Sequence, residues 1–367
     1  MRKKIDSIFL GITLILTIFG FLIFTSASLG LLSGAKADLV TLVTSKQLLI
    51  GIVGGLIAAF FASKIKYIFW RKNAFYILLL TTALSLLIFV PGLGLEHNGA
   101  KRWLNIGPIS FQPSEFLKYG YIIYLAAWFS KKSKHADDPK FGLIPFCVIS
   151  GIVSILLILQ PDTDTLAVML ISGLSIFFAS GARWKDIFII GLIGIIGLAG
   201  IVSMKPYIRN RIMTFIDPAG HPQTSGYQIQ QSLIAIGSGG LTGKGFGQSV
   251  QKFGFLPEPV GDSIFAVAGE EFGFIGGVAI IILFLFFALR GLRISVRAPD
   301  EFGRLLGLGI VILITTQAFM NISAMLAIIP LSGQTLPLIS HGGTALLVTL
   351  GAIGIVFNIS KDQKKLS

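Results

Sequence analysis

Charged residues are scarce in this sequence. They make up 13% of its 367 residues, whereas hydrophobic residues make up 53%. A soluble chain of this length needs considerably more polar surface to cover its core. The composition therefore excludes an ordinary soluble protein and predicts a membrane protein.

Cysteine and histidine are also scarce. The single cysteine, Cys147, has no partner for an intrachain disulfide and lies in an apolar run, so we interpret it as a small buried side chain. Histidine occurs four times, with no two residues at metal-ligand spacing: His97, His135, His221 and His341. These shortages argue against a disulfide scaffold and a structural metal site.

Ten long apolar stretches dominate what is present. They cover residues 8–29, 47–63, 74–92, 114–130, 142–159, 165–181, 186–203, 263–289, 304–328 and 341–359. Each is close to the length that crosses a bilayer as a helix, and the alternating pattern of a β-barrel is missing. The sequence predicts an all-α polytopic membrane protein with about ten transmembrane helices, forming a single domain over residues 1–367.

Basic residues indicate the orientation of these helices. Lysine and arginine number 30 against 17 acidic residues, and 20 of the 30 fall on one side if both termini are cytoplasmic. This asymmetry follows the positive-inside rule, so the net charge of +13 needs no nucleic-acid partner. The first stretch is too long for a signal peptide, and we expect it to be retained.

A large extracytoplasmic loop, residues 204–262, is predicted between the seventh and eighth spans. Loops of this length are rarely simple connections, so we expect it to carry function. It ends in Leu256-Pro257-Glu258-Pro259-Val260-Gly261-Asp262, just where an apolar stretch begins. A partly desolvated carboxylate at Asp262 suits a general base, although a helix-capping role for the same residue stays open.

Basic residues also gather on the predicted outer face, against the usual bias. They are Lys36, Lys46, Lys101, Arg102, Lys205, Arg209, Arg211, Lys244 and Lys252. Such a cluster at a lipid interface suits a phosphate or pyrophosphate headgroup. Contact with ordinary anionic lipid, or simple solvation, explains the charges equally well.

Several charged residues fall in or beside the apolar stretches. Glu115 and Lys118 are three residues apart and can pair on one helix face, whereas Asp162, Glu270 and Glu271 lie near the outer surface. Charges inside a membrane usually face an interior or a wet cavity. A structural ion pair is the favoured interpretation for Glu115 and Lys118, and a functional role is the favoured one for the acidic residues near the surface.

The glycine-rich run from Gly237 to Gly245 is not a phosphate-binding P-loop. Ser238 occupies the first glycine position of that motif, and Gly245 follows Lys244 where Ser or Thr is required. A flexible backbone that approaches a headgroup closely is the better interpretation.

Several blocks together resemble the SEDS family (shape, elongation, division and sporulation), which includes RodA, FtsW and SpoVE. The matching segments are Gly99–Leu104, Gln112–Glu115, Gln160–Asp162, Tyr227–Ser232, Gly243–Glu271 and Pro337–Gly343. The resemblance runs nearly end to end, and the blocks around Ser249–Lys252, Gly269–Glu271 and Asn358–Ser360 are more similar to the FtsW branch than to RodA.

The resemblance implies a peptidoglycan glycosyltransferase that polymerises lipid II, an undecaprenyl-pyrophosphate-linked disaccharide-peptide, on the outer face of the bacterial cytoplasmic membrane. It implies a class B penicillin-binding protein as transpeptidase partner, and a role in division or cell shape. Asp262 matches the proposed catalytic carboxylate. The expected substrate-binding residues are Lys101, Arg102, Trp103, Arg209, Arg211, Gln231, Lys244, Ser340, Gly342 and Gly343. No cofactor is certain, although a divalent cation such as Mg or Mn could assist the leaving group.

Three departures from the family pattern stand out. Val260-Gly261 replace the usual His-Thr before the carboxylate, Thr163-Asp164-Thr165 replace Leu-Gly-Thr, and His341 takes a tyrosine position. None of them removes the carboxylate. Two alternatives stay open: a lipid II flippase that uses the intramembrane charges, and a non-catalytic scaffold for the transpeptidase.

Overall fold

The computed structural model describes residues 4–33, 37–97, 100–106, 109–132, 138–217, 220 and 225–363. Lys36 and Gly99, which the sequence analysis singled out, lie outside these residues. Each of the ten apolar stretches falls on helical structure. The helices in and around these stretches are α1 Ser7–Ser28, α2 Ala37–Lys46, α3 Gly55–Lys64, α4 Ile68–Leu86, α5 Pro113–Lys132, α6 Leu143–Leu159, α7 Thr163–Ala179, α8 Trp184–Met204, α11 Ile264–Val296, α12 Glu301–Met325 and α13 Gly343–Lys361. A π-helical stretch, Gln47–Gly54, joins α2 to α3.

The described residues contain seven helical segments that are long and apolar enough to cross a membrane, and α6 and α7 are shorter apolar helices. The charged residues of α5 set it apart: Glu115, Lys118, Lys131 and Lys132. The protein is thus a multi-pass membrane protein, and the count of ten crossings stays a prediction.

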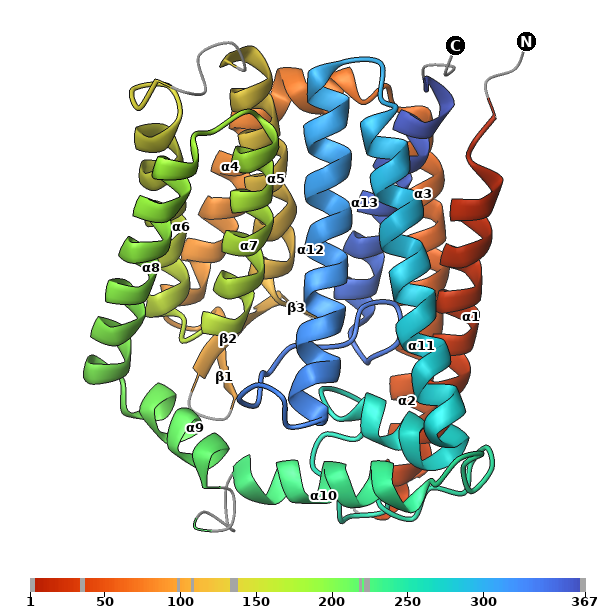
Figure 1. Cartoon of the computed structure of the whole chain (residues 1–367). Helices are drawn as coiled ribbons and strands as arrows, with labels where there is room; N and C mark the ends of the chain where they lie inside the picture. The colour runs from red at the N-terminus through yellow and green to blue at the C-terminus, as the bar shows by residue number, and fades with distance from the viewer. Residues whose placement is uncertain are drawn as a thin grey trace.

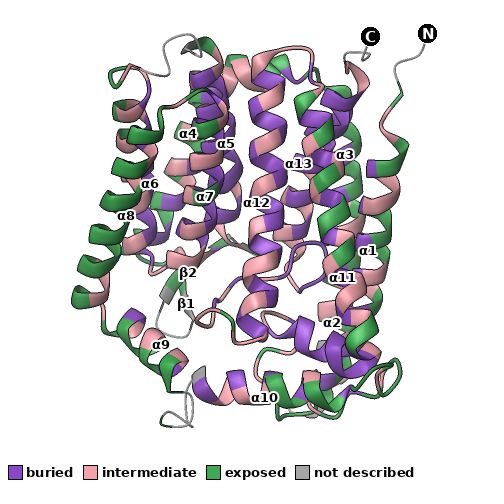
Figure 2. Ribbon diagram, viewed as in Figure 1, coloured by how far each residue is buried: buried purple, intermediate pink, exposed green. Residues whose placement is uncertain are grey.

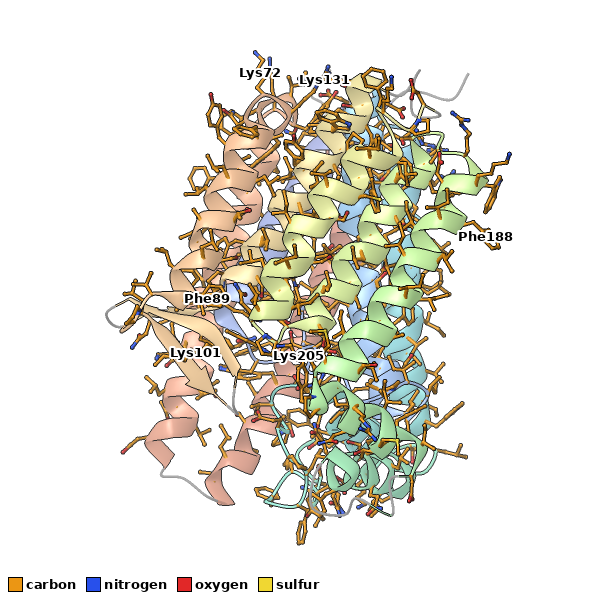
Figure 3. The ribbon with its side chains drawn as sticks, turned by 90° about the vertical axis from the view of Figure 1, so that its left-hand side faces the viewer. Lys72, Phe89, Lys101, Lys131, Phe188 and Lys205 are labelled. Atoms are coloured by element: carbon orange, nitrogen blue, oxygen red, sulfur yellow. The ribbon has the colours of Figure 1, made fainter. Side chains whose placement is uncertain are left out.

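The helices form an upright bundle with α12 in the middle and α8 and α1 at opposite edges (Figure 1). The backbone N–H of Asp6 donates to Ser360 Oγ at 3.1 Å, so α1 begins where α13 ends. Lys72 and Lys131 lie at this end, whereas Lys101 and Lys205 lie toward the other (Figure 3). This arrangement agrees with the predicted sorting of basic residues, while the side of the membrane that each end faces stays a prediction.

The expectation of a purely helical chain is wrong in one place. The connection between α4 and α5 forms an antiparallel sheet in the order β1 (Gly94–His97), β2 (Ala100–Ile106), β3 (Ile109–Phe111). Leu95 pairs with Trp103 and Leu104 with Phe111, with a bulge between Leu95 and Glu96. Strands this short leave too little alternation for a sequence pattern to reveal.

The segment 204–262 also holds more structure than a loop. Its helices α9 (Pro206–Ile216) and α10 (Ser225–Ser238) lie across the lower end of the bundle (Figure 1). Pro206 occupies the first turn of α9, where the ring tolerates its missing N–H. After α10 the chain is an irregular coil whose glycines adopt positive φ at Gly240, Gly243, Gly245, Gly247 and Gly254.

Helix α11 is broken near its start. Gly273 has φ 66° and ψ −163°, a conformation open essentially to glycine alone. A Cβ added there would lie 2.3 Å from the backbone nitrogen of Gly243. The first turns of α11 and the glycine-rich coil therefore pack backbone against backbone.

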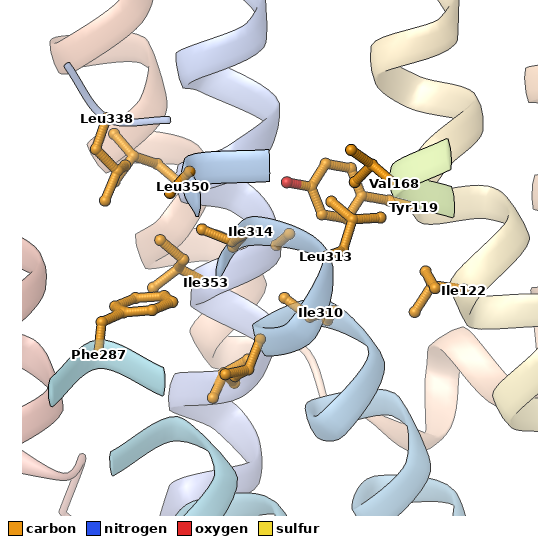
Figure 4. Close-up of a cluster of buried hydrophobic side chains, with 14 of the residues drawn as sticks. Tyr119, Ile122, Val168, Phe287, Ile310, Leu313, Ile314, Leu338, Leu350 and Ile353 are labelled. Atoms are coloured by element: carbon orange, nitrogen blue, oxygen red, sulfur yellow. The ribbon is translucent and has the colours of Figure 1, made fainter. Parts of the chain in front are cut away.

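Buried side chains concentrate around α12, whereas α8 is exposed along its length (Figure 2). Figure 4 shows Ile310, Leu313 and Ile314 of α12 between Phe287 of α11 and Tyr119 of α5. The apolar surface of α8 faces outward, as suits a helix whose neighbours are lipid chains.

Candidate active site

Asp262 follows two residues whose backbone is held from a distant part of the chain. The backbone N–H of His341 donates to the carbonyl of Val260 at 2.7 Å, and the Ser340 hydroxyl donates to the carbonyl of Gly261 at 2.8 Å. The segment before α13 thereby fixes the chain immediately before the carboxylate. Ser340 makes this positioning contact, and its substrate-binding role stays a prediction.

A third anchor comes from α12. The amide of Asn321 donates to the carbonyl of Asp262 and to that of Gln334, both at 2.7 Å. The N-cap of α11 is Ser263, whose hydroxyl accepts from Gln228 at 2.9 Å rather than from the helix. Asp262 is therefore not the capping residue, and its side chain stays available for other contacts.

Sequence reasoning missed Asn321, although a signal was present. Gln317 and Asn321 are four residues apart in an apolar helix, so they share a face. Both are buried, and both donate to the 334–335 segment, Gln317 through a 3.1 Å bond to the Thr335 carbonyl. Two buried amides at this spacing mark the face of α12 that supports the site.

Three charged groups converge beside Gly333. A Cβ built on this glycine would lie 3.6 Å from Asp164 Oδ2, 3.7 Å from Arg211 Nη2 and 3.7 Å from Asp262 Oδ2. Arg211 donates to Asp164 Oδ2 at 2.7 Å, and the Gly333 N–H donates to the same oxygen at 3.1 Å. The structure therefore brings Arg211 of α9 close to Asp262, and the substrate-binding role of this arginine stays a prediction.

The surroundings of Asp262 raise its pKa to about 7, chiefly because burial disfavours the charged carboxylate. The negative charges of Glu258 and Asp164 raise this pKa further, and the positive charges of Arg211 and Arg102 oppose them. A carboxyl group with a pKa near neutrality can accept a proton and release it again, which is what general base catalysis requires.

Arg102 and Asp162 lie next to this group of charges, near the start of α7. Arg102 donates from Nη2 to the carbonyl of Pro161. Asp162 is buried and accepts from Gln112 at 3.0 Å and from Ser114 at 2.9 Å. Asp162 thus ties the start of α7 to the start of α5, which is a structural contact.

The structure places Lys244, Glu270 and Glu271 in a different network. Lys244 Nζ lies 2.6 Å from Glu270, and Lys252 Nζ lies 2.7 Å from Glu271. Glu270 also accepts from Ser249 at 2.5 Å. These pairs fasten the glycine-rich coil to α11, so the lysines are paired with carboxylates rather than directed at Asp262.

The remaining predicted binding residues lie on separate elements. Lys101 is exposed on β2, Trp103 is half-buried on the same strand, Arg209 is exposed on α9, and Gln231 is half-buried on α10. Gly342 donates its N–H to Gln47 Oε1 at 3.1 Å, and Gly343 is the first residue of α13.

The interpretation of Glu115 and Lys118 as an ion pair agrees with the structure. Lys118 is fully buried and donates to Glu115 at 2.8 Å and to Gln317 at 2.7 Å. A small cavity next to this pair is lined by Glu115, Gln317 and the 335–342 segment, including His341. Glu115 Oε2 and His341 Nδ1 are both buried there without a hydrogen-bond partner.

Among the described residues no group of three or more His, Cys, Asp or Glu side chains is arranged to hold a metal ion. A divalent cation stays a prediction that rests on the family resemblance.

Comparisons with known proteins decide the family. The model of the FTSW_RODA_SPOVE family, described as "Cell cycle protein", matches residues 6–365. The chain belongs to this family. Two relatives of the FTSW_RODA_SPOVE family support the assignment. Stage V sporulation protein E of Bacillus subtilis (strain 168) is 38% identical over 359 residues, which cover 98% of each chain. Probable peptidoglycan glycosyltransferase FtsW of Geobacter sp. (strain M18) is 36% identical, over 98% of this chain and 97% of that one.

Solved structures confirm the family fold. A chain from "Structural coordination of polymerization and crosslinking by a peptidoglycan synthase complex" superimposes with a TM-score of 0.79, at 26% identity over 98% of both chains. Rod shape determining protein RodA of Thermus thermophilus superimposes with a TM-score of 0.71 at 24% identity, over 98% of both chains.

Proposed function

We propose that this FTSW_RODA_SPOVE protein is a peptidoglycan glycosyltransferase that polymerises lipid II on the outer face of the bacterial cytoplasmic membrane. The observation that carries the proposal is the carboxyl group of Asp262, whose pKa is raised to about 7 and which faces Arg211 and Asp164 at Gly333. The name of the Geobacter relative, probable peptidoglycan glycosyltransferase FtsW, supports the same activity.

In the proposed reaction the 4-hydroxyl oxygen of the acceptor sugar attacks the anomeric carbon of the donor. A glycosidic bond forms, the bond from that carbon to the pyrophosphate breaks, and the hydroxyl proton passes to Asp262. The departing lipid pyrophosphate gains negative charge, which the guanidinium groups of Arg211 and Arg102 would stabilise. Lys101, Trp103, Arg209 and Gln231 are proposed to contact more distant parts of the two substrates.

Replacement of the usual His-Thr by Val260-Gly261 is compatible with this role. Both residues hold the site through backbone carbonyls, which accept from His341 and Ser340. A carbonyl is present whatever the side chain is. The anchoring of Asp262 therefore does not require histidine or threonine at these positions.

The proposed partner is a class B penicillin-binding protein that cross-links the new strands. The similar chain of known structure comes from a peptidoglycan synthase complex that couples polymerization to crosslinking. One relative is named as a sporulation protein and another as FtsW. These names support a role in division or cell shape.

The decisive experiment uses the purified full-length chain with its transpeptidase partner and labelled lipid II. Asp262→Ala and Asp262→Asn are expected to lower polymerisation by about 100-fold or more, the contribution of a positioned general base. Glu301→Gln, which removes a carboxylate paired with Arg304 at the opposite end of the bundle, is the matched control. Unimpaired glycan synthesis by folded Asp262→Ala protein would refute the assigned role.

A flippase interpretation has less support. The charges that motivated it each form an ion pair within the protein: Glu115 with Lys118, Glu270 with Lys244, and Glu271 with Lys252. A leaflet-accessibility assay in proteoliposomes separates the two activities: transport that survives Asp262→Ala but fails in Lys118→Ala would favour the flippase. A scaffold would support growth with Asp262→Ala and lose it only when the partner interface changes.

A further inference from the structure

Asp164 stands at a position where the resemblance leads one to expect glycine. It is the second residue of α7, at the same end of the bundle as Asp262. Its Oδ2 accepts from Arg211 at 2.7 Å and from the Gly333 N–H at 3.1 Å. Asp164 therefore makes two hydrogen bonds at the edge of the candidate active site that the side chain of a glycine cannot make.

The partner of Asp164 reaches past it toward Asp262. Arg211 donates from Nη1 to Asp164. Its Nη2 and Asp262 Oδ2 each lie 3.7 Å from the Cβ position of Gly333. Once released from Asp164, a guanidinium beside the same glycine as the carboxylate would be able to form a bidentate pair with it. Such a pair would occupy the oxygens that a general base needs for its substrate proton.

We propose that Asp164 of α7 is a positioning residue that holds Arg211 of α9 in place. The guanidinium then stays beside Asp262 without forming an ion pair with the catalytic carboxylate. Only the catalytic role of Asp262 in this inference rests on the proposed function. The anchoring itself is a property of the folded chain and can be measured without substrate.

Four charged groups act on Asp262 from the surrounding elements. Two are negative, Asp164 of α7 and Glu258 of the preceding turn, and two are positive, Arg211 of α9 and Arg102 of β2. Removal of the Asp164 charge takes away a repulsion and also releases Arg211. Both changes favour the ionised form of Asp262, so they lower its pKa.

The test is the pH dependence of Asp262 modification by a hydrophobic carbodiimide, which reacts with the protonated carboxyl group, followed by mass spectrometry of the full-length protein. In Asp164→Asn the midpoint of this reaction is expected to move by about one pH unit or more to lower pH. Asp164→Glu, which restores a carboxylate, should return the midpoint toward that of wild type. Glu301→Gln, far from the site, should leave it unchanged.

Arg211→Gln gives a shift of opposite sign, because it removes a positive charge and leaves Asp164 in place. Its midpoint should move to higher pH. Opposite shifts cannot come from unfolding, which would move both variants toward the ordinary value of an aspartate. An unchanged or raised midpoint in folded Asp164→Asn protein would overturn the proposal.

Polymerisation assays then separate the two proposals. If wild type makes glycan, the lower pH limb of kcat should move in Asp164→Asn in the same direction as the labelling midpoint, with a lower plateau. If wild type makes no glycan but the labelling midpoints shift as stated, the polymerase assignment fails while the anchoring role stands. If glycan forms and no midpoint shifts, the anchoring role alone fails.

Discussion

Asp262 combines an anchored main chain with a carboxyl group of raised pKa. Its main chain is fixed by His341, Ser340 and Asn321 through three consecutive carbonyls, while its carboxyl group has a pKa of about 7. A fixed backbone holds the carboxyl group in position, and the raised pKa means that this group binds a proton more tightly than an ordinary aspartate does. Both are requirements of a general base.

The raised pKa of Asp262 predicts a pH-dependent stability. Its folded value of about 7 exceeds the ordinary 3.8, so between these values the folded protein holds a proton that the unfolded chain has released. The free energy of unfolding therefore falls as pH rises through this window. Asp262→Asn cannot ionise and should have a Tm a few degrees above that of wild type at about pH 8, with the difference vanishing below about pH 4.

Thermal unfolding of both proteins in the same detergent across this range checks the prediction. Polymerisation should show the complementary trend, with kcat rising through about pH 7 as the base loses its proton. A Tm difference that is constant over the whole range would contradict the assignment of the shift to Asp262.

Asn321 supports the site through the backbone. Asn321→Ala removes both bonds and leaves one buried and one part-buried carbonyl without this donor, so we expect a loss of about 1–3 kcal/mol in the free energy of unfolding. The kcat of polymerisation should fall more than KM changes, because the substitution displaces Asp262. The control is Asn73→Ala, since Asn73 is half-buried and donates to Phe69 in its own helix, away from the site. Equal effects of the two substitutions would show that Asn321 has no special role.

At the scale of elements, the break in α11 sets where the coil can dock. Gly273→Ala should destabilise the fold by about 1–3 kcal/mol from backbone strain alone, with a further cost because the added carbon meets Gly243. Gly194→Ala on α8 is the control, since nothing lies within 4 Å of its Cβ position. That substitution should be neutral or slightly stabilising. Chemical unfolding in mixed micelles measures both.

How far the elements follow from sequence depends on their length. The ten apolar stretches coincide with helices, because runs of about twenty apolar residues leave the backbone no alternative in lipid. The sheet before α5, the break at Gly273 and the helices α9 and α10 were not predicted. Each is a short or half-polar segment whose conformation depends on contacts with other elements, which local patterns do not carry.

At the scale of the whole molecule, a buried ion pair links distant segments at the lower end of the bundle. Lys252 is fully buried and donates to Glu271 at 2.7 Å and to Ser26 of α1 at 2.9 Å, which links the coil, α11 and α1. A functional role was the favoured interpretation for Glu271, and for Lys252 a phosphate headgroup and ordinary lipid were equally good explanations. Sequence reasoning could find the lysines and carboxylates but not their pairing, because the partners come from segments that are far apart in the chain.

Loss of one member of such a pair leaves an uncompensated buried charge. Glu271→Gln is expected to cost about 3–5 kcal/mol in the free energy of unfolding, far more than Glu301→Gln, whose pair with Arg304 is about one-third exposed. A double-mutant cycle of Glu271→Gln with Lys252→Met should recover part of this loss, as measured by urea unfolding. Strictly additive effects would mean that the two residues do not interact.

The site itself was predictable in part. Asp262, Arg211 and Arg102 were expected near one another, and the charges of both arginines do act on Asp262. This part was predictable because a carboxylate at a loop-to-helix junction and basic residues in neighbouring loops can be recognised in the sequence. Gly333 left no such signature, because it acts through its backbone N–H, and Asn321 was overlooked although its spacing from Gln317 was a signal. Contacts of that kind become visible only once the chain is folded.

The carbonyl anchors of Val260 and Gly261 have an evolutionary consequence. Because recognition there passes through atoms common to all amino acids, the pair is free to drift while the aspartate after it keeps its place. A search that demands His-Thr before that aspartate would miss this chain, in which the turn is held by hydrogen bonds from Ser340 and Asn321.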